Sequence, residues 1–216
     1  MSVWGSSLPC PPGNMAMPPA FLSDSALVSI YNPATSHKWR SLAGGRGMFI
    51  GVPADLMRSY WSVQEREDYC WSACVQMVLR VYGVERPQSE IDLRGNWINL
   101  FGLFPDRSGT RFSIENNFNE FLFSQFISTH GEGAPAPNRL LDEFSNCRPI
   151  IVGYYENPLP HHAIVIFGAD CIQTNGGTVI KTISVADPFP GRGIVFWDSE
   201  QLYRTISSHW CIHAYN

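Results

Sequence analysis

Residues 64–83 have the sequence QEREDYCWSACVQMVLRVYG, in which Cys70 follows Gln64 by six positions. From Cys70 onward, apolar residues recur at intervals of three and four and cover most of the circumference of a helix. Gly83 stands where such a helix would end. Because a helix N-terminus carries unpaired N–H groups and about half a positive charge, it stabilises the thiolate of a cysteine placed there. The segment therefore predicts a buried central helix over 70–82 with a reactive cysteine at its first residue.

The composition of the chain is that of a packed globular protein. Of its 216 residues, 44% are hydrophobic, 13% are aromatic and 16% are charged, which favours one domain of ordinary size with an aromatic-rich core. The net charge is −4, and the lysines and arginines are scattered singly along the chain. This pattern argues against nucleic acid as a partner. The oligomeric state is left open.

The first 47 residues differ from the rest. They are rich in Pro, Gly, Ser and Met and show no sustained hydrophobic period, so we expect an N-terminal extension over 1–47 and a single domain over 48–216. The extension lacks the basic start and the apolar run of a signal peptide, and no segment reaches the ~18 apolar residues of a membrane span. We therefore expect no membrane span, and a location in the cytoplasm or secretion by a bacterial effector route that needs no signal peptide.

Helical patterns occupy the first half of 48–216 and strand patterns the second. After a short strand at 48–52 and the helix at 70–82, we expect helices at 90–94, from 113 to about 126 and at 138–145, the first two capped by Ser89 and Ser113. Strands are expected at 150–155, 162–167, 179–185, 193–197 and 210–215, with a short helix capped by Asp198. Helices followed by an antiparallel sheet make an α+β fold.

The strand patterns supply two partners for a thiol nucleophile. His162 stands at the start of a strand that is apolar on both faces, so a rigid buried element would hold its imidazole. Asp187 ends the following strand and is fixed in extended geometry by Pro188. Cys, His and Asp in this order supply a nucleophile, a base and a residue that orients the base. In this scheme His162 takes or shares the Cys70 proton and later protonates the leaving amine.

Gln64 would present its side-chain amide to the oxyanion together with the Cys70 backbone N–H. The spacing of these two residues, with Trp71 next, resembles the papain-like cysteine peptidases, in which a glutamine precedes the nucleophile by that interval. The resemblance is greater to the bacterial branch that contains the double-glycine peptidases and the cysteine-protease effectors of plant-pathogenic bacteria. In those families a strand similar to CRPIIVGY at 147–154 precedes a His-Ala strand and an Asp-Pro turn.

The resemblance covers about residues 48–216 and implies a papain-like fold, in which a helical subdomain built on the Cys70 helix packs on an antiparallel sheet. It implies a cysteine peptidase that acts on protein or peptide substrates through Cys70, His162, Asp187 and Gln64, without a cofactor or metal. Secreted effectors and self-processing proteases both occur in this branch, so each role is an expectation for the chain.

Two of these assignments have competitors. His161 directly precedes His162, and only one of two successive strand residues can face the thiol. The alanine that follows favours His162, as in the family pattern. Asp170 and Asp198 compete with Asp187 for the orienting role. The first lies about eight residues along the strand, which is too far at ~3.3 Å per residue, and the second is expected to cap a helix.

The chemistry has alternatives too. Cys74, one turn after Cys70, could form a metal-binding pair with the two histidines, although core packing is the favoured interpretation. We interpret the six cysteines, at positions 10, 70, 74, 147, 171 and 211, as mostly reduced. The same triad could catalyse peptidoglycan amide hydrolysis, deamidation or transamidation, or the chain could be a catalytically silent peptide-binding module. Leu42-Ala43-Gly44-Gly45 resembles a double-glycine cleavage site, so self-cleavage after Gly45 is a further hypothesis.

Overall fold

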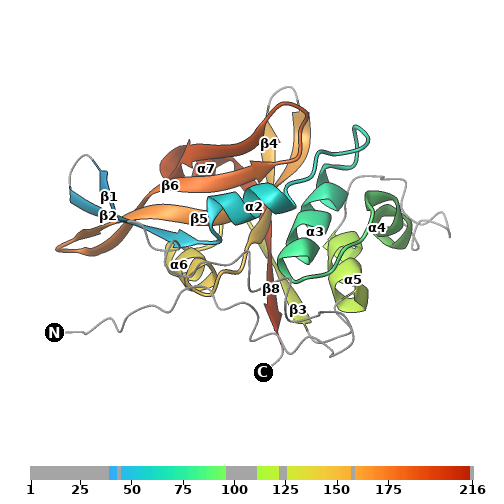
Figure 1. Ribbon diagram of the computed structural model, residues 1–216, viewed down its shortest axis with the longest axis horizontal. Helices are drawn as coiled ribbons and strands as arrows, with labels where there is room; N and C mark the ends of the chain where they lie inside the picture. Colours follow the sequence, from blue (N-terminus) through green and yellow to red (C-terminus); the bar gives the residue numbers. More distant parts are fainter. Residues whose placement is uncertain (1–38, 43–44, 96–110, 122–125, 157–158, 215–216) are drawn as a thin grey trace.

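The computed structural model describes residues 39–42, 45–95, 111–121, 126–156 and 159–214 (Figure 1). The elements of this part follow the chain in the order β1 Trp39–Leu42, β2 Gly45–Gly51, α2 Ala54–Tyr60, α3 Cys70–Val81, α4 Gln88–Gly95, α5 Arg111–Phe121, β3 Phe126–Glu132, α6 Pro137–Ser145, β4 Ile150–Glu156, β5 Leu159–Thr174, β6 Gly177–Asp187, β7 Gly193–Asp198, α7 Ser199–Thr205 and β8 Ile206–Ala214. The strands form one antiparallel eight-stranded sheet in the order β1-β2-β5-β4-β8-β3, with β6 paired to β5 and β7 to β6. The predicted α+β class is confirmed.

The long strand β5 is the centre of the sheet. One of its edges pairs first with β4 and then with β2, and its other edge pairs with β6. Its side chains alternate between two hydrophobic cores, with Ala163, Val165 and Phe167 in one and Ile164 and Ile166 in the other. A continuous apolar run suits a strand that is buried on both faces, which is why this sequence forms the middle of the sheet. His162 directly precedes the doubly buried run, so the sheet holds its backbone rigidly.

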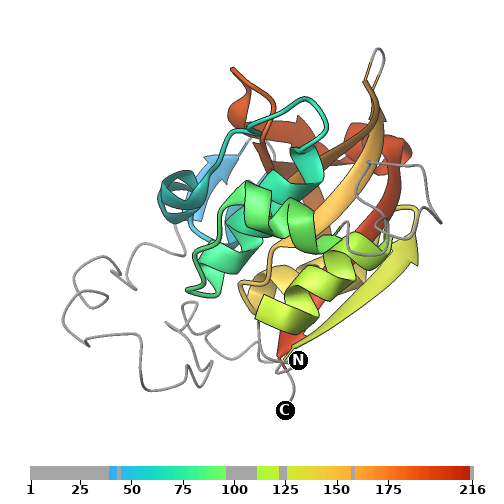
Figure 2. The same ribbon diagram turned by 90° about the vertical axis from the view of Figure 1, so that its right-hand side faces the viewer.

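Helices cover both faces of the sheet. On one face α3 packs against β5 and β4, and α4 and α5 pack on α3 and on each other, which makes the helical half on the right of Figure 1 and at the front of Figure 2. On the other face α6 packs against β2 and β5, and α7 against β6, β7 and β4. Among the helices of the described ranges, none has the length and apolar character needed to cross a membrane.

Helix α3 matches the predicted helix to within one residue. Residues 71–79 are all buried, because β5, α4 and α5 surround the helix. At its end the Gly83 N–H bonds to Arg80 O at 2.9 Å and the Val84 N–H to Leu79 O at 2.9 Å. This is a Schellman motif, and the φ of 77° at Gly83 explains why a glycine stands there.

The beginning of the sheet differs from the prediction. β1 and the first residues of β2 precede residue 48, so the sheet includes part of the segment that the sequence assigned to the extension. Residues 1–38 lie outside the described ranges. Helix α2 was not predicted, because its seven residues are too few for a helical period to stand out.

The predicted helix from 113 to about 126 is wrong at both ends. α5 ends at Phe121, and residues 126–132 form β3, an edge strand that pairs with β8. Pairing with β8 overrides the local helical pattern there. Ser113 lies inside α5 and donates from its Oγ to Gly95 O at 3.1 Å, and Ser89 lies inside α4, so neither serine is the cap that the sequence suggested.

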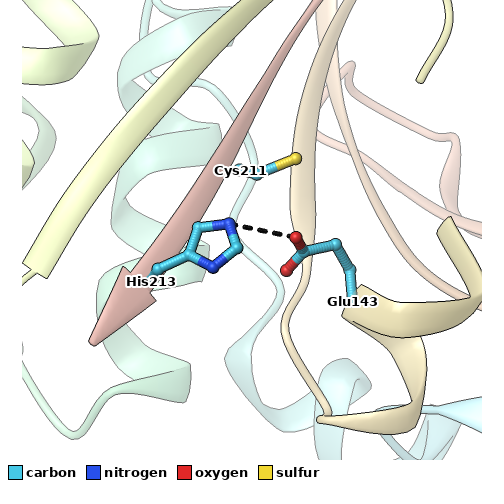
Figure 3. A group of neighbouring side chains, drawn as sticks. All are labelled: Glu143, Cys211 and His213. Carbon is cyan, nitrogen blue, oxygen red and sulfur yellow. Dashed lines mark ion pairs between the residues drawn. The ribbon is translucent and has the colours of Figure 1, made fainter. Parts of the chain in front are cut away.

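A buried charge cluster joins α6 to β8 (Figure 3). The Glu143 side chain is fully buried, and Arg139 Nε lies 2.7 Å from its Oε1 while Arg148 Nε lies 2.7 Å from its Oε2. His213 Nε2 lies 3.0 Å from Oε1 and 2.5 Å from Arg139 Nη2. Burial and the positive charges of Arg148 and Arg139 lower the pKa of His213 to about 4. At neutral pH the histidine is therefore uncharged and accepts the Arg139 hydrogen bond.

We expect His213 to make the fold sensitive to mild acid. Its pKa is about 4 in the fold and about 6.5 in an unfolded chain, so the unfolded state binds more protons between these values and stability falls as the pH drops through them. The charged groups that face the ring are Glu143, Arg139, Arg148 and Asp142. Urea unfolding at about pH 7 and about pH 5.5 should show a smaller loss of stability for His213→Gln than for the wild type. Equal losses would contradict this account.

Candidate active site

Cys70 is the first residue of α3 and lies at the boundary between the helical half and the sheet. Its thiol is free and half-buried, whereas the residues of the next two turns are fully buried. In the described part of the chain no side chain caps the helix at Tyr69. The positive end of the helix therefore stays beside the Cys70 thiol, where it favours the thiolate.

Strand β5 brings His162 to the same place. Its side chain is 4% exposed, and its Nε2 lies 2.7 Å from Asp187 Oδ1 at the end of β6. The ring also lies close enough to Cys70 for the thiol to raise the His162 pKa. Because Nε2 meets Asp187, Nδ1 is the ring nitrogen left for the thiol. The structure thus brings together three residues that the sequence predicted as partners, each from a different element.

The two partners of the imidazole favour its protonated form. Burial disfavours a charged ring, but the hydrogen bonds from His162 to Asp187 and Cys70, with the charges of both, outweigh burial and raise its pKa to about 9. Burial by itself would raise the pKa of Asp187, yet the hydrogen bonds from His162 and the Phe189 N–H lower it below its ordinary value. Near neutral pH the site therefore holds an imidazolium between the Asp187 carboxylate and the Cys70 sulfur.

The Asp187 carboxylate is fully buried and has donors on both oxygens. Oδ1 accepts from His162 and, at 2.9 Å, from the Phe189 N–H of the Asp-Pro turn. Oδ2 accepts from Arg192 Nη1 at 3.1 Å. A buried carboxylate needs such partners because its own desolvation is costly.

The segment before Cys70 is tied to the same turn. Trp61 Nε1 donates to Asp187 O at 2.8 Å, and the Gln64 N–H donates to Pro188 O at 2.9 Å. These two bonds join the polar residues that lead into α3 to the end of β6. One side-chain bond and one backbone bond therefore fix the segment that carries the nucleophile relative to the acid.

Aromatic rings enclose the imidazole. Tyr154 of β4 is the cross-strand partner of His162, and their ring centroids lie 5.6 Å apart in an edge arrangement. Phe189 meets His162 edge-on at 6.1 Å, and Trp197 holds the Tyr154 ring from another side at 5.3 Å. Such rings exclude water from the His162–Asp187 hydrogen bond, which strengthens it.

Gln64 does not have the geometry that its predicted role requires. It is 8% exposed, and its Nε2 donates to Arg66 O and to Glu67 O, both at 3.0 Å. Its Oε1 is buried and has no hydrogen-bond partner among the described atoms. Both N–H bonds of the amide are occupied within the loop, so neither is free for an oxyanion in this arrangement. The oxyanion role stays a prediction.

Two buried glutamines that the sequence analysis did not single out hold this loop. Gln88 of α4 donates from Nε2 to Val63 O at 2.7 Å and accepts the Glu65 N–H on Oε1 at 3.0 Å. These two hydrogen bonds hold the backbone on both sides of Gln64. Gln76 of α3 accepts a hydrogen bond from Gln88 at 3.2 Å. The sequence feature that could have pointed to these glutamines is Gln76, a polar residue in the middle of a mostly apolar helix.

The competing residues have other roles or fall outside the description. Asp170 accepts a hydrogen bond from Thr182 at 2.8 Å, and Asp198 caps α7 as the sequence predicted. The His161 side chain lies outside the described part of the structure. His162 makes the contacts with both the thiol and the acid.

Solved structures of bacterial peptidases share the fold. The peptidase domain of Streptococcus ComA, a bifunctional ABC transporter of a quorum-sensing pathway, is 13% identical with a TM-score of 0.54, and the match covers 72% of this chain and 98% of that one. A putative C39-like peptidase from Bacillus anthracis is 11% identical with a TM-score of 0.50, over 76% of this chain and 96% of that one. A double glycine motif protease from an AMS/PCAT transporter, in complex with a leader peptide, is 16% identical with a TM-score of 0.49, over 71% and 89%.

The chain has the papain-like fold of these peptidase domains. The resemblance that the sequence at 147–154 suggested is thus confirmed at the level of the fold. No family model matches the sequence, and no curated protein matches it. Because the identities are low, the comparison establishes the papain-like fold and leaves the reaction to be argued from the site.

Among the described residues, one group of side chains has its ligand atoms close enough together to be considered as a metal site. The ligand atoms of Glu143, Cys211 and His213 lie within 4.8 Å of one another (Figure 3). Arg139 and Arg148 already pair with the two carboxylate oxygens, and Arg139 also hydrogen-bonds His213 and Cys211. A divalent cation would have to displace two guanidinium groups from a buried carboxylate. The cluster fits an ion-pair network and does not fit a metal.

Cys74 packs in the core. It is fully buried in the cluster between α3 and the sheet. Burial, with the nearby negative charges of Cys70 and Asp187, raises the pKa of the Cys74 thiol well above its ordinary value. Of the described cysteines, Cys70, Cys74, Cys171 and Cys211 are free thiols and Cys147 is disulfide-bonded.

Of the free cysteines that the structure describes, we expect a thiol-directed peptide electrophile to label only Cys70 in the native protein. Cys70 is half-buried at the helix start, whereas Cys74 is fully buried and its raised pKa keeps it protonated. Intact-mass measurement followed by peptide mapping should show no adduct on Cys70→Ala and a normal adduct on Cys74→Ala, which serves as the matched control. An adduct that persists in Cys70→Ala would contradict the assignment.

Proposed function

We propose that the chain is a cysteine peptidase that cleaves peptide bonds of protein or peptide substrates through Cys70, His162 and Asp187. The observation that carries the proposal is the contact of His162 with both Cys70 and Asp187. The fold shared with bacterial peptidase domains supports it. A cysteine at a helix start, a histidine with a raised pKa and a buried carboxylate are the groups that thiol activation requires.

The proposed reaction has two stages. The Cys70 thiolate attacks the carbonyl carbon of the scissile bond, which forms a C–S bond and a tetrahedral oxyanion. His162 gives its proton to the leaving amine as the C–N bond breaks, and a thioester remains. A water that loses a proton to His162 then attacks the thioester, and the sulfur leaves as thiolate beside the imidazolium. Asp187 stays ionised and keeps the ring aligned.

The oxyanion would be bound by the Cys70 backbone N–H and by Gln64 Nε2. Because both N–H bonds of this amide donate to loop carbonyls, Gln64 would exchange Arg66 O or Glu67 O for the oxyanion. Loss of one such donor costs about 100-fold to 1,000-fold in kcat in other hydrolases.

A second candidate function uses the same thioester for another acyl transfer, such as peptidoglycan amide hydrolysis, deamidation or transamidation, since the intermediate does not dictate what resolves it. A third is a peptide-binding module without catalysis. The intact contacts of His162 favour an enzyme over the binding module. The effector role and the cellular location stay predictions from the sequence.

We expect the full-length protein to cleave a subset of peptides in an unbiased library and Cys70→Ala to cleave none. Mass spectrometry of the products would also give the specificity. Muropeptides and glutamine-containing proteins, incubated in parallel, test the alternatives. Ammonia release or muropeptide cleavage without peptide-bond hydrolysis would replace the proposal by the acyl-transfer alternative. Absence of turnover and of any thiol adduct would favour the binding module.

The hypothesis of self-cleavage after Gly45 meets a geometric constraint. Leu42 pairs with Gly45 across the β1–β2 hairpin, and the two residues between them lie outside the described ranges. Gly47 pairs with Ile172, ten positions along β5 from His162, so the hairpin lies on the order of 30 Å from the imidazole. In this conformation Cys70 cannot reach the Gly45 peptide bond of its own chain. Self-processing would require a second copy.

The self-cleavage hypothesis therefore predicts an intermolecular reaction. Intact-mass measurement after long incubation should show loss of residues 1–45 from the wild type and none from Cys70→Ala alone. Catalytic amounts of wild type should then cut the Cys70→Ala protein. Full-length masses in all three samples would end the hypothesis without affecting the proposed peptidase activity on other substrates.

A further inference from the structure

Arg192 lies in the turn between β6 and β7 and contacts three parts of the candidate site. Its Nη1 donates to Asp187 Oδ2 and to Tyr154 Oη, both at 3.1 Å. Its guanidinium carbon lies 5.0 Å from the centre of the Phe189 ring. Tyr154 and Phe189 are the two rings that meet His162 edge-on. One guanidinium thus touches the acid and both aromatic walls of the imidazole site.

The backbone of the turn is shaped for this contact. Gly191 and Gly193, on either side of Arg192, have φ values of 85° and 67°, which side chains with a Cβ rarely adopt. A Cβ on either glycine would meet no atom within 4 Å, so the reason for glycine is backbone conformation and not lack of space. The two left-handed residues turn the chain so that Arg192 comes back onto the end of β6.

The contact with Oδ2 constrains the orientation of the carboxylate. Oδ1 of Asp187 holds His162 and the Phe189 N–H, and a carboxylate held through one oxygen could still rotate about its Cβ–Cγ bond. Arg192 holds the second oxygen, and Tyr154, which is 1% exposed, holds Arg192 in turn. The Arg192 side chain is 31% exposed to solvent, whereas the Asp187 side chain is fully buried, so the arginine reaches from the surface to a buried carboxylate.

We propose that Arg192 is a positioning residue of this site: by joining Asp187 Oδ2 to the Tyr154 hydroxyl, it fixes the direction in which Asp187 Oδ1 meets His162. The proposal rests on the proposed function. Arg192 contacts Asp187 directly and meets the two rings beside His162, so it acts on the imidazole through Asp187. Its charge has a second effect, because a cation beside Asp187 offsets part of the attraction of that carboxylate for the imidazolium. The imidazolium then stays acidic enough to protonate a leaving amine.

The decisive measurement is an NMR titration of the His162 imidazole in the full-length protein, assigned by its loss in His162→Ala. The titratable groups that face the ring are Cys70, Asp187 and Tyr154. We expect Arg192→Gln to raise the titration midpoint of His162 by about one pH unit, since a positive charge is removed. Arg192→Lys keeps the charge and should titrate as the wild type does.

The matched control is Arg80→Gln. Arg80 has a side-chain exposure of 22%, similar to that of Arg192, and pairs with Glu85 at 2.6 Å near the other end of α3. Arg80 also donates to Tyr60 O at 3.2 Å, but its charge is paired with Glu85 and not with Asp187, so the His162 midpoint should not move. Tyr154→Phe, which keeps the charge and the ring but removes the hydroxyl, should also leave the midpoint in place.

Kinetics on a peptide substrate separate positioning from general stability. We expect Arg192→Gln to lower kcat by about 10-fold to 100-fold with KM unchanged. The alkaline limb of the pH profile of kcat/KM should move to higher pH by as much as the titration midpoint of His162 does. Arg192→Lys and Tyr154→Phe should show smaller losses of kcat without a shift of this limb. Arg80→Gln should keep the wild-type kcat.

An unchanged His162 midpoint in folded Arg192→Gln would overturn the proposal, as would a loss of kcat no greater than that of Arg80→Gln. If Arg192→Gln fails to fold, as judged by circular dichroism, wild-type kcat in both Arg192→Lys and Tyr154→Phe would overturn it instead. The titration needs no substrate. A wild type that cleaves nothing would therefore refute the peptidase function, while the titration would still report whether Arg192 acts on the Asp187–His162 pair.

Discussion

The hydrogen bond of 2.7 Å between His162 Nε2 and Asp187 Oδ1 is the interaction on which the site depends. It is almost completely buried, so the carboxylate has given up its hydration and depends on protein donors. Breaking a buried pair by removing one partner costs about 3–5 kcal/mol, because an uncompensated charge remains. The same bond fixes the ring so that its other nitrogen meets Cys70. The His162–Asp187 hydrogen bond therefore both stabilises the buried carboxylate and orients the imidazole.

The fold supplies the rigidity that this contact needs. β5 is paired on both edges and buried on both faces, and β6, which ends at Asp187, is its neighbour. α3 crosses β5 and delivers Cys70 from the other half. The loop between the halves is held by Trp61 and Gln64 at the Asp-Pro turn and by Gln88 from α4. Each of the three groups is thus placed by an element with little freedom to move.

The sequence predicted the elements with strong periodicity and missed those fixed by tertiary contacts. α3 and the strands around His162 follow from continuous apolar patterns, and the cap at Asp198 from local chemistry. β3 could not be predicted, because only its pairing with β8 makes an ambiguous segment a strand. Arg192 was missed for a related reason: its contact with Tyr154 spans 38 positions of sequence, and no local pattern reports such a distance. A residue type at a motif position can be read from sequence, whereas the orientation of the Gln64 amide cannot.

If the Gln64 amide has the proposed oxyanion role, it is a donor that would be used only in the transition state. Its N–H groups donate to neutral carbonyls, while its own oxygen is buried without a partner among the described atoms, a state that costs about 1–3 kcal/mol for such a group. A tetrahedral oxyanion is charged and accepts a hydrogen bond roughly twice as strong as that of a neutral carbonyl. Exchange of one loop carbonyl for the oxyanion would therefore be favourable only after charge has developed. Because Gln88 fixes the backbone on both sides of Gln64, the exchange would involve the side chain alone. A hydrogen bond that strengthens only as the reaction proceeds accelerates it, whereas one that binds the ground state equally well does not.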